Sequence, residues 1–80
     1  MIVVDARGQR CPLPVIRLAQ EVANLPDGSE VTVLATDPAA AHDIPAWCRM
    51  RGHRLVETHD EGDHTAYVVV VRPSAPAAAG

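Results

Sequence analysis

The spacing of apolar residues changes along the chain, and each spacing predicts one kind of element. Residues 2–6 form a short apolar run, which is typical of a strand. Between residues 12 and 25, apolar side chains recur every three or four positions, and this predicts an amphipathic helix. Residues 30–36 alternate between two faces, as a strand does. The first half of the chain is therefore expected to fold as strand, helix, strand.

A second helix is predicted from Asp37 to Arg51. Asp37 suits the cap position, Pro38 suits the first turn, and Gly52 is a natural C-cap. The run 43–45 (Asp-Ile-Pro) resembles a second helix start, so we expect a kink or a short turn there.

The last part of the chain predicts a β-hairpin. Strands are expected at 54–59 and 65–71, with the polar run 60–63 as the turn between them. The complete order is β-α-β-α-β-β. It predicts an α/β (α+β) two-layer sandwich, in which two helices lie on one face of a four-stranded mixed sheet, with a right-handed crossover joining two parallel strands.

Eighty residues allow one domain, which we place at 1–72. The segment 73–80 contains only Pro, Ser, Ala and Gly, and we expect a disordered tail there. On the sheet face without helices, Val3, Leu34 and valines of the last strand are expected to leave an apolar patch for a partner.

Composition narrows the classes of function. The net charge is −3, the seven basic residues are all arginine, and aromatic residues make up 2% of the chain. This balance argues against binding of nucleic acid. No apolar run is long enough for a membrane span, and the N-terminus does not look like a secretory signal. Two cysteines in such a chain are expected to be reduced thiols in the cytosol.

The main candidate for chemistry is the run 11–14, Cys-Pro-Leu-Pro. Pro12 and Pro14 suit a first helical turn, which places Cys11 at a helix N-terminus. Free N–H groups and the helix dipole there favour a thiolate, so we expect a lowered pKa for Cys11. A buried structural cysteine is the alternative. Because Cys11 follows a polar loop, we expect a partly exposed, functional thiol.

Neighbouring residues are expected to support Cys11. Arg7, Arg10 and the more distant Arg17 could stabilise a thiolate or a persulfide. Gly8 gives the loop access to positive φ. Asp5, at the end of the first strand, either orients the loop through hydrogen bonds to Arg7 or to backbone N–H groups, or is an ordinary strand-end acid.

The other reactive side chains favour structural interpretations. Cys48 shares an apolar helix face with Ile44 and Trp47, so we expect a core residue; a resolving thiol that pairs with Cys11 is the alternative. The spacing of the four histidines matches no familiar zinc pattern, and no cofactor site is expected. These side chains and the hairpin-turn carboxylates are expected at the surface: His42, His53, His59, His64, Asp60, Glu61 and Asp63.

Two stretches resemble a known family. Residues 5–14 (Asp-Ala-Arg-Gly-Gln-Arg-Cys-Pro-Leu-Pro) are similar to the signature of the TusA family of sulfur carriers, also called SirA-like proteins. Residues 36–48, with 52–55, resemble the second conserved block of that family. The resemblance covers about residues 3–72. Leu13 departs from the pattern, because some members have Glu there.

The resemblance implies a function for Cys11. It implies a two-layer sandwich in which Cys11 accepts sulfane sulfur as a persulfide from a cysteine desulfurase or a rhodanese-type donor. The sulfur then passes to an acceptor cysteine, as in the synthesis of 2-thiouridine in tRNA, in sulfur oxidation or in molybdenum-cofactor synthesis. It also implies that Cys48 is not the carrier.

The resulting hypothesis is a cytosolic sulfur carrier, expected to be monomeric. Its activity would be of the sulfurtransferase type. It is not expected to be a turnover enzyme, because the sequence shows no general base, phosphate-binding loop or cofactor domain. The alternatives are a thiol redox protein, which would need Cys48, and a regulatory protein-interaction module, which would not need Cys11. Direct binding of nucleic acid is the weakest alternative.

Overall fold

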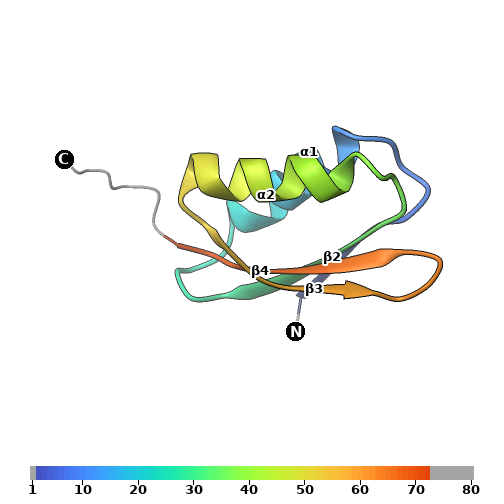
Figure 1. Ribbon diagram of the computed structural model, residues 1–80. Helices are drawn as coiled ribbons and strands as arrows, with labels where there is room; N and C mark the ends of the chain where they lie inside the picture. The colour runs from blue at the N-terminus through green and yellow to red at the C-terminus, as the bar shows by residue number, and fades with distance from the viewer. Residues whose placement is uncertain (1, 73–80) are drawn as a thin grey trace.

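The computed structural model describes residues 2–72, and its element order agrees with the sequence pattern. The elements are β1 (Ile2–Ala6), α1 (Leu13–Val22), β2 (Glu30–Ala35), α2 (Ala40–Arg51), β3 (Arg54–Asp60) and β4 (Thr65–Val70). Both helices lie on one face of the sheet (Figure 1). The predicted two-layer α+β sandwich is therefore confirmed. The predicted tail at 73–80 lies outside the described residues.

The sheet has the strand order β1-β2-β4-β3. Strands β1 and β2 pair in parallel, so α1 is the crossover between them, whereas β4 pairs antiparallel with β2 and β3. The hairpin predicted from the polar run 60–63 is formed by β3 and β4. A shift in register between Leu55 and Glu57 interrupts the pairing of this hairpin.

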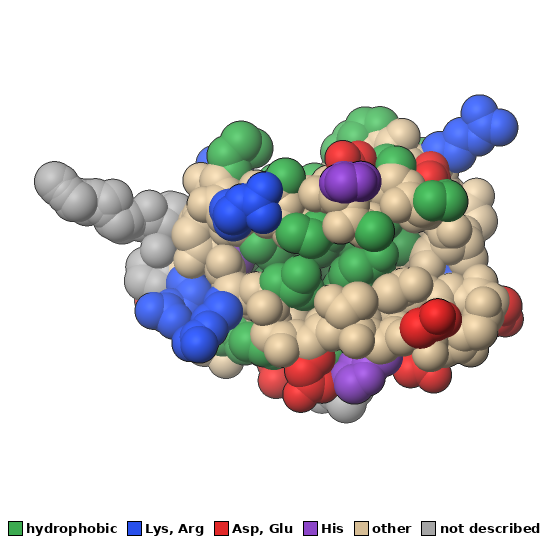
Figure 2. Space-filling view, in the orientation of Figure 1, with side chains coloured by type: hydrophobic (Ala, Val, Ile, Leu, Met, Phe, Trp, Pro, Cys, Tyr) green, Lys and Arg blue, Asp and Glu red, His purple; other side chains and the backbone are tan. Residues whose placement is uncertain are grey.

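Strand alternation produces the core between the two layers. The buried side chains of β2 are Val31, Val33 and Ala35, the same three that the alternating pattern places on one face. Helix α1 contributes Leu18 and α2 contributes Ile44, and neither side chain has exposed surface. Figure 2 shows hydrophobic side chains in the opening between α2 and the sheet.

The face of the sheet opposite the helices is partly apolar, as expected. Register places Val3, Thr32 and Val68 in one row across β1, β2 and β4. Val3 is 50% exposed. The next row contains Leu34, but it begins with Asp5 and ends with His59, so polar side chains limit the patch.

Helix α2 differs from the expectation at 43–45. It is one continuous helix from Ala40 to Arg51 with Pro45 inside it, so a turn at 43–45 is wrong, whereas a kink at Pro45 stays a prediction. Proline lacks an N–H, but the burial of Ile44 against the core offsets the loss of one helical hydrogen bond. A short turn does occur earlier, where the Ala40 N–H donates to the carbonyl of Asp37.

No helix within residues 2–72 is long and apolar enough to cross a membrane.

Candidate functional site

Cys11 lies in the loop that joins β1 to α1, immediately before the helix. It is half-buried and packs against the core. Pro12 is the residue before the helix, the bond between Cys11 and Pro12 is cis, and the buried Pro14 lies in the first turn. The expected position and partial exposure of Cys11 are confirmed.

Asp37 ties the Cys11 loop to the start of α2. Its Oδ2 accepts a hydrogen bond from the Cys11 N–H at 3.0 Å, and its Oδ1 accepts one from the Ala39 N–H at 2.9 Å. These two backbone donors hold the pKa of the Asp37 carboxyl below its ordinary value. Figure 1 shows the loop after β1 beside the link between β2 and α2. One carboxylate therefore joins segments 26 residues apart.

The thiol of Cys11 has a raised pKa, so the expectation of a lowered one is wrong. Burial, together with the nearby carboxylates of Asp43 and Asp37, raises the pKa of Cys11 to about 11. A carboxylate beside a thiol disfavours the second negative charge. In the free protein at neutral pH, Cys11 is therefore a protonated thiol.

The backbone explains why the helix N-terminus does not offset this effect. Prolines 12 and 14 have no N–H, which removes two of the donors that a helix start usually offers. The Cys11 N–H donates to Asp37, and the Leu13 N–H donates to the Arg10 carbonyl at 2.9 Å. The four residues of the Cys-Pro-Leu-Pro run thus leave no backbone N–H free for the sulfur.

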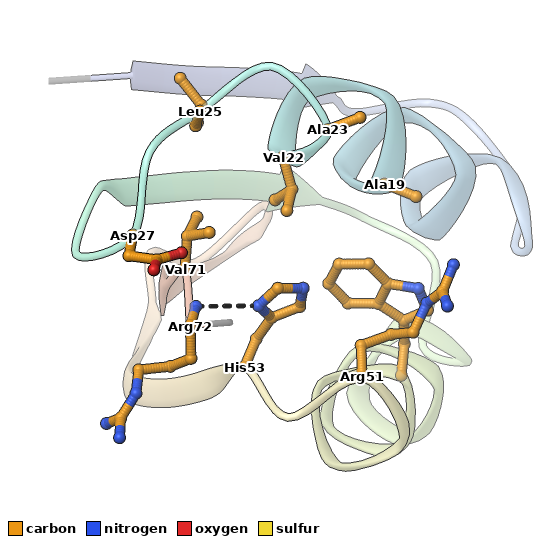
Figure 3. A pocket seen from close by; sticks show the side chains of 10 residues that line it. Ala19, Val22, Ala23, Leu25, Asp27, Arg51, His53, Val71 and Arg72 are labelled. Carbon is orange, nitrogen blue, oxygen red and sulfur yellow. Dashed lines mark hydrogen bonds between the residues drawn. The ribbon is translucent and has the colours of Figure 1, made fainter. Parts of the chain in front are cut away.

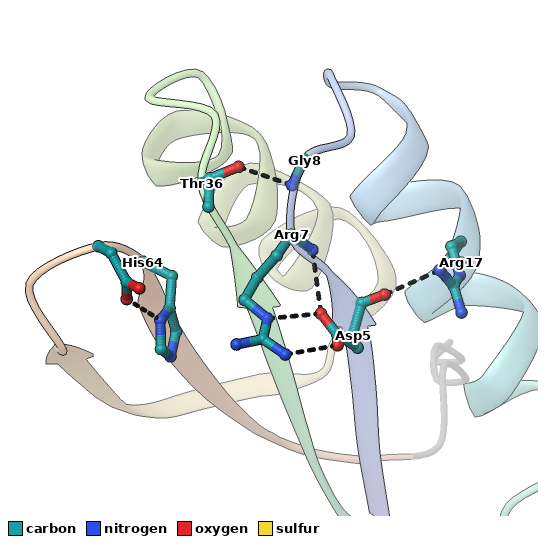
Figure 4. A network of polar contacts seen from close by, with 7 residues as sticks. Asp5, Arg7, Gly8, Arg17, Thr36 and His64 are labelled. Atoms are coloured by element: carbon teal, nitrogen blue, oxygen red, sulfur yellow. Dashed lines mark hydrogen bonds and ion pairs between the residues drawn. The ribbon is translucent and has the colours of Figure 1, made fainter.

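Asp5 orients the loop through hydrogen bonds to Arg7, so it is more than an ordinary strand-end acid. Its carboxylate accepts from the Arg7 Nε at 2.9 Å, from the Arg7 Nη2 at 2.8 Å and from the Arg7 backbone N–H (Figure 4). These bonds hold the pKa of Asp5 well below its usual range. Arg17 donates to the backbone carbonyl of Asp5 at 2.8 Å. Arg7 and Arg17 thus organise the end of β1, and neither is among the groups that shift the pKa of Cys11.

Gly8 and Arg10 occupy the rest of this loop. Gly8 has a φ of +81° and donates its N–H to the Thr36 Oγ1 at 2.8 Å, which fastens the loop to the end of β2 (Figure 4). Arg10 is exposed, and its charge acts on Asp37, which it helps to keep ionised. The arginines expected around the thiol therefore support the loop and the carboxylate that holds it.

A hollow of about 340 Å³ opens beside Cys11, between the two helices. Asp43 lies in the first turn of α2, and its carboxylate contributes to the raised pKa of the Cys11 thiol. The hollow is lined by Pro12, Val15, Asp43, Ala46, Trp47 and Met50. The sequence pattern assigned Asp37 and Asp43 only to helix starts, because their closeness to Cys11 depends on how α2 packs beside α1.

Cys48 is a core residue. It lies in α2, is 2% exposed and is a free thiol, as is Cys11. Burial raises the pKa of Cys48 to about 11. This agrees with the structural interpretation, because a resolving thiol must be accessible as a thiolate.

Three of the four histidines have side-chain partners other than Cys11. His53 stacks on Trp47 with ring centroids 4.9 Å apart, His59 pairs with Glu57, and His64 pairs with Asp63 in the hairpin turn. Within residues 2–72, no three His, Cys, Asp or Glu side chains gather as a metal site requires.

The turn between β3 and β4 has a structural role. Asp60 accepts a hydrogen bond from the Gly62 N–H at 2.9 Å, which shapes the turn.

A second hollow, of about 300 Å³, lies at the opposite end of the helices (Figure 3). Residues from the C-terminal ends of both helices and from the segment after β4 line it, including Val22, Arg51 and Arg72. His53 accepts a hydrogen bond from the Arg72 N–H at 3.1 Å at this end. The hollow does not include Cys11.

Comparison with known proteins gives a consistent result. Residues 2–72 match the family model described as Sulfurtransferase TusA. A putative sulfur carrier protein of Archaeoglobus fulgidus is 42% identical over 69 residues, which cover 86% of this chain and 94% of the relative. The sulfur carrier protein TusA of Pseudomonas putida strain GB-1 is 42% identical over 65 residues, covering 81% of each chain.

A solved structure agrees with these matches. The crystal structure of a SirA-like protein from Desulfitobacterium hafniense has a TM-score of 0.80 and 30% identity, covering 90% of this chain and 99% of that one. From the family model, the relatives and the fold together, the chain belongs to the TusA family.

Proposed function

We propose that this protein is a sulfur carrier that holds sulfane sulfur as a persulfide on Cys11. The observation that carries the proposal is the position of Cys11: it is the one partly exposed thiol within residues 2–72, and the next residue, Pro12, lines a hollow. The relatives named sulfur carrier proteins support the same role.

The exchange proceeds in two displacement steps. The Cys11 thiol loses its proton to solvent, and the thiolate attacks the terminal sulfur of a donor persulfide. The donor's S–S bond breaks as the new bond to Cys11 forms, and the donor cysteine leaves as a thiolate that takes a proton from solvent. An acceptor thiolate then attacks the outer sulfur and releases Cys11. Neither step needs an oxidant, because sulfane sulfur only changes partner.

The supporting residues have defined parts in this proposal. Asp5, Arg7 and Gly8 fix the loop against the ends of β1 and β2. Pro12 and Pro14 remove two of the N–H groups that a helix start usually offers, which lessens the stabilisation of an anionic sulfur. The positive charge of Arg10 acts on Asp37, and because Arg10 is exposed, it can also interact with an incoming partner protein.

The partners in the proposal are a protein sulfur donor of the cysteine desulfurase or rhodanese type and an acceptor protein cysteine. Thiolation of tRNA, sulfur oxidation and molybdenum-cofactor synthesis remain the candidate routes. We place the exchange in the cytosol, where the two free thiols stay reduced. A role as a redox protein is less well supported, because Cys48 is buried.

Cyanide tests whether the bound sulfur can be transferred. The protein is incubated with a cysteine desulfurase and cysteine, separated from both, and treated with cyanide, which removes sulfane sulfur as thiocyanate. We expect up to one thiocyanate per chain for wild type and for Cys48→Ala, and none for Cys11→Ser. Equal thiocyanate from Cys11→Ser would refute the assignment.

A further inference from the structure

The hollow beside Cys11 combines an apolar wall with one charged group. Five of its lining residues are apolar, and the sixth is Asp43. Trp47 contributes an aromatic ring to the wall, and Met50, which is 77% exposed, lies at its rim. A site of this composition suits a side chain with an aliphatic stem and a cationic head, because the stem covers apolar surface while the head reaches the carboxylate.

Two acids and a phenol influence the thiol electrostatically. Asp43 comes from α2, Asp37 from the link before α2, and Tyr67 from β4, and all three interact with Cys11. Burial and the two carboxylates together raise the pKa of the thiol, so the free protein keeps Cys11 protonated.

The three arginines nearest to Cys11 in the sequence act on other carboxylates or carbonyls than Asp43. Arg7 and Arg17 bind Asp5, and the charge of Arg10 acts on Asp37. No ion pair within residues 2–72 includes Asp43. The Asp43 carboxylate thus lacks an ion-pair partner from the described part of the chain.

We propose that the hollow receives a lysine or arginine side chain of the sulfur donor or acceptor, which pairs with Asp43 while Cys11 reacts. The inference rests on the proposed function of Cys11. Once Asp43 is paired, its repulsion of the thiolate is offset, and the proton of Cys11 leaves to solvent more readily. The cation forms no covalent bond. The thiol is therefore protonated and unreactive in the free protein, and it becomes reactive when a partner with a cationic side chain binds.

Activated-disulfide peptides test this preference directly. Three short peptides carry a cysteine activated by a 2-thiopyridyl group and differ only in the neighbouring residue, which is arginine, citrulline or glutamate. Reaction with Cys11 releases a coloured thione, and mass spectrometry locates the mixed disulfide. At fixed ionic strength we expect wild type to react on the order of tenfold faster with the arginine peptide than with the citrulline peptide, as one unit of thiol pKa would give.

Variants assign the preference to Asp43. Asp43→Asn should bring the arginine-to-citrulline rate ratio close to one and should react faster than wild type with the citrulline peptide. Asp27→Asn is the matched control, because it removes the same charge from the turn after α1, at the far end of the helix. It should keep the wild-type ratio. Circular dichroism checks that both variants are folded.

Two results would overturn the inference. One is a ratio near one in wild type, which needs no variant. The other is an unchanged ratio in folded Asp43→Asn. Loading by the desulfurase separates this inference from the proposed function. If Cys11 accepts sulfur but shows no arginine preference, only the proposal of a cation-binding hollow is refuted. If Cys11 does not accept sulfur, the proposed carrier function is refuted.

Discussion

At the scale of single residues, the chemistry of this protein depends on what surrounds one sulfur atom. Cys11 lies two residues before α1, yet its pKa is raised to about 11 by burial and by two carboxylates. Position at a helix N-terminus is thus not sufficient for a thiolate. The free backbone donors must be present, and in the Cys-Pro-Leu-Pro run they are absent or already used.

This environment predicts the pH dependence of Cys11 alkylation. Only the thiolate reacts with iodoacetamide. The alkylation rate of Cys11 in the folded protein should therefore rise about tenfold per pH unit from pH 7 to pH 10. In the urea-unfolded chain, where the thiol returns to its ordinary pKa of 9.0, the rise should level off near pH 9. Mass spectrometry identifies Cys11 as the labelled site. A plateau at or below about pH 9 in the folded protein, as in the unfolded chain, would contradict the raised pKa.

At the scale of elements, the site is formed where two helices begin side by side. Asp37 accepts a backbone N–H from the Cys11 loop and another from the start of α2. Both bonds require an ionised carboxylate as a strong acceptor. The connection of the loop to α2 should therefore weaken in acid.

The lowered pKa of Asp37 sets the direction of this effect. Because the folded value lies below the ordinary 3.8, the stabilisation is complete above pH 3.8 and is lost as the pH falls through the folded pKa. We expect the urea midpoint of wild type to fall between pH 5 and pH 3. Asp37→Asn should have a lower midpoint at pH 5 and a smaller further decrease. An identical pH dependence in the two proteins would refute this role.

Helix α1 offers a matched test of packing. Leu18 has no exposed surface, whereas Leu13 in the same helix is 47% exposed. Leu18→Ala should lower the free energy of unfolding by about 2–5 kcal/mol. Leu13→Ala should cost less than about 1 kcal/mol, since surface positions contribute little. Urea denaturation measures both, and equal losses would show that α1 does not pack as described.

At the scale of the whole molecule, the sequence predicts the architecture better than the site. The alternation of Val31 and Val33 and the polar hairpin turn are local patterns, and each element has its expected type. The turn expected at Pro45 does not form, because tertiary burial of Ile44 outweighs the local tendency of proline to interrupt a helix. Local patterns cannot show which side chains a fold brings together.

The electrostatics of Cys11 illustrate this limit. The sequence identifies the cysteine and its loop, but the carboxylates of Asp37 and Asp43 come from the other helical segment. Their distance to the sulfur depends on the packing of α1 beside α2. No periodicity along the chain encodes that contact. The helix N-terminus alone therefore predicts a lowered pKa for Cys11, whereas the pKa in the fold is raised.

The central claim is that Cys11, and not Cys48, holds the sulfur. After reaction with a cysteine desulfurase and cysteine, the intact mass of each protein is measured without reductant, and the adduct is mapped by fragmentation. The account predicts an increase by one sulfur atom on wild type and Cys48→Ala, located at Cys11, and no increase on Cys11→Ser. A sulfur adduct on Cys11→Ser, or one mapped to Cys48 in wild type, would contradict it.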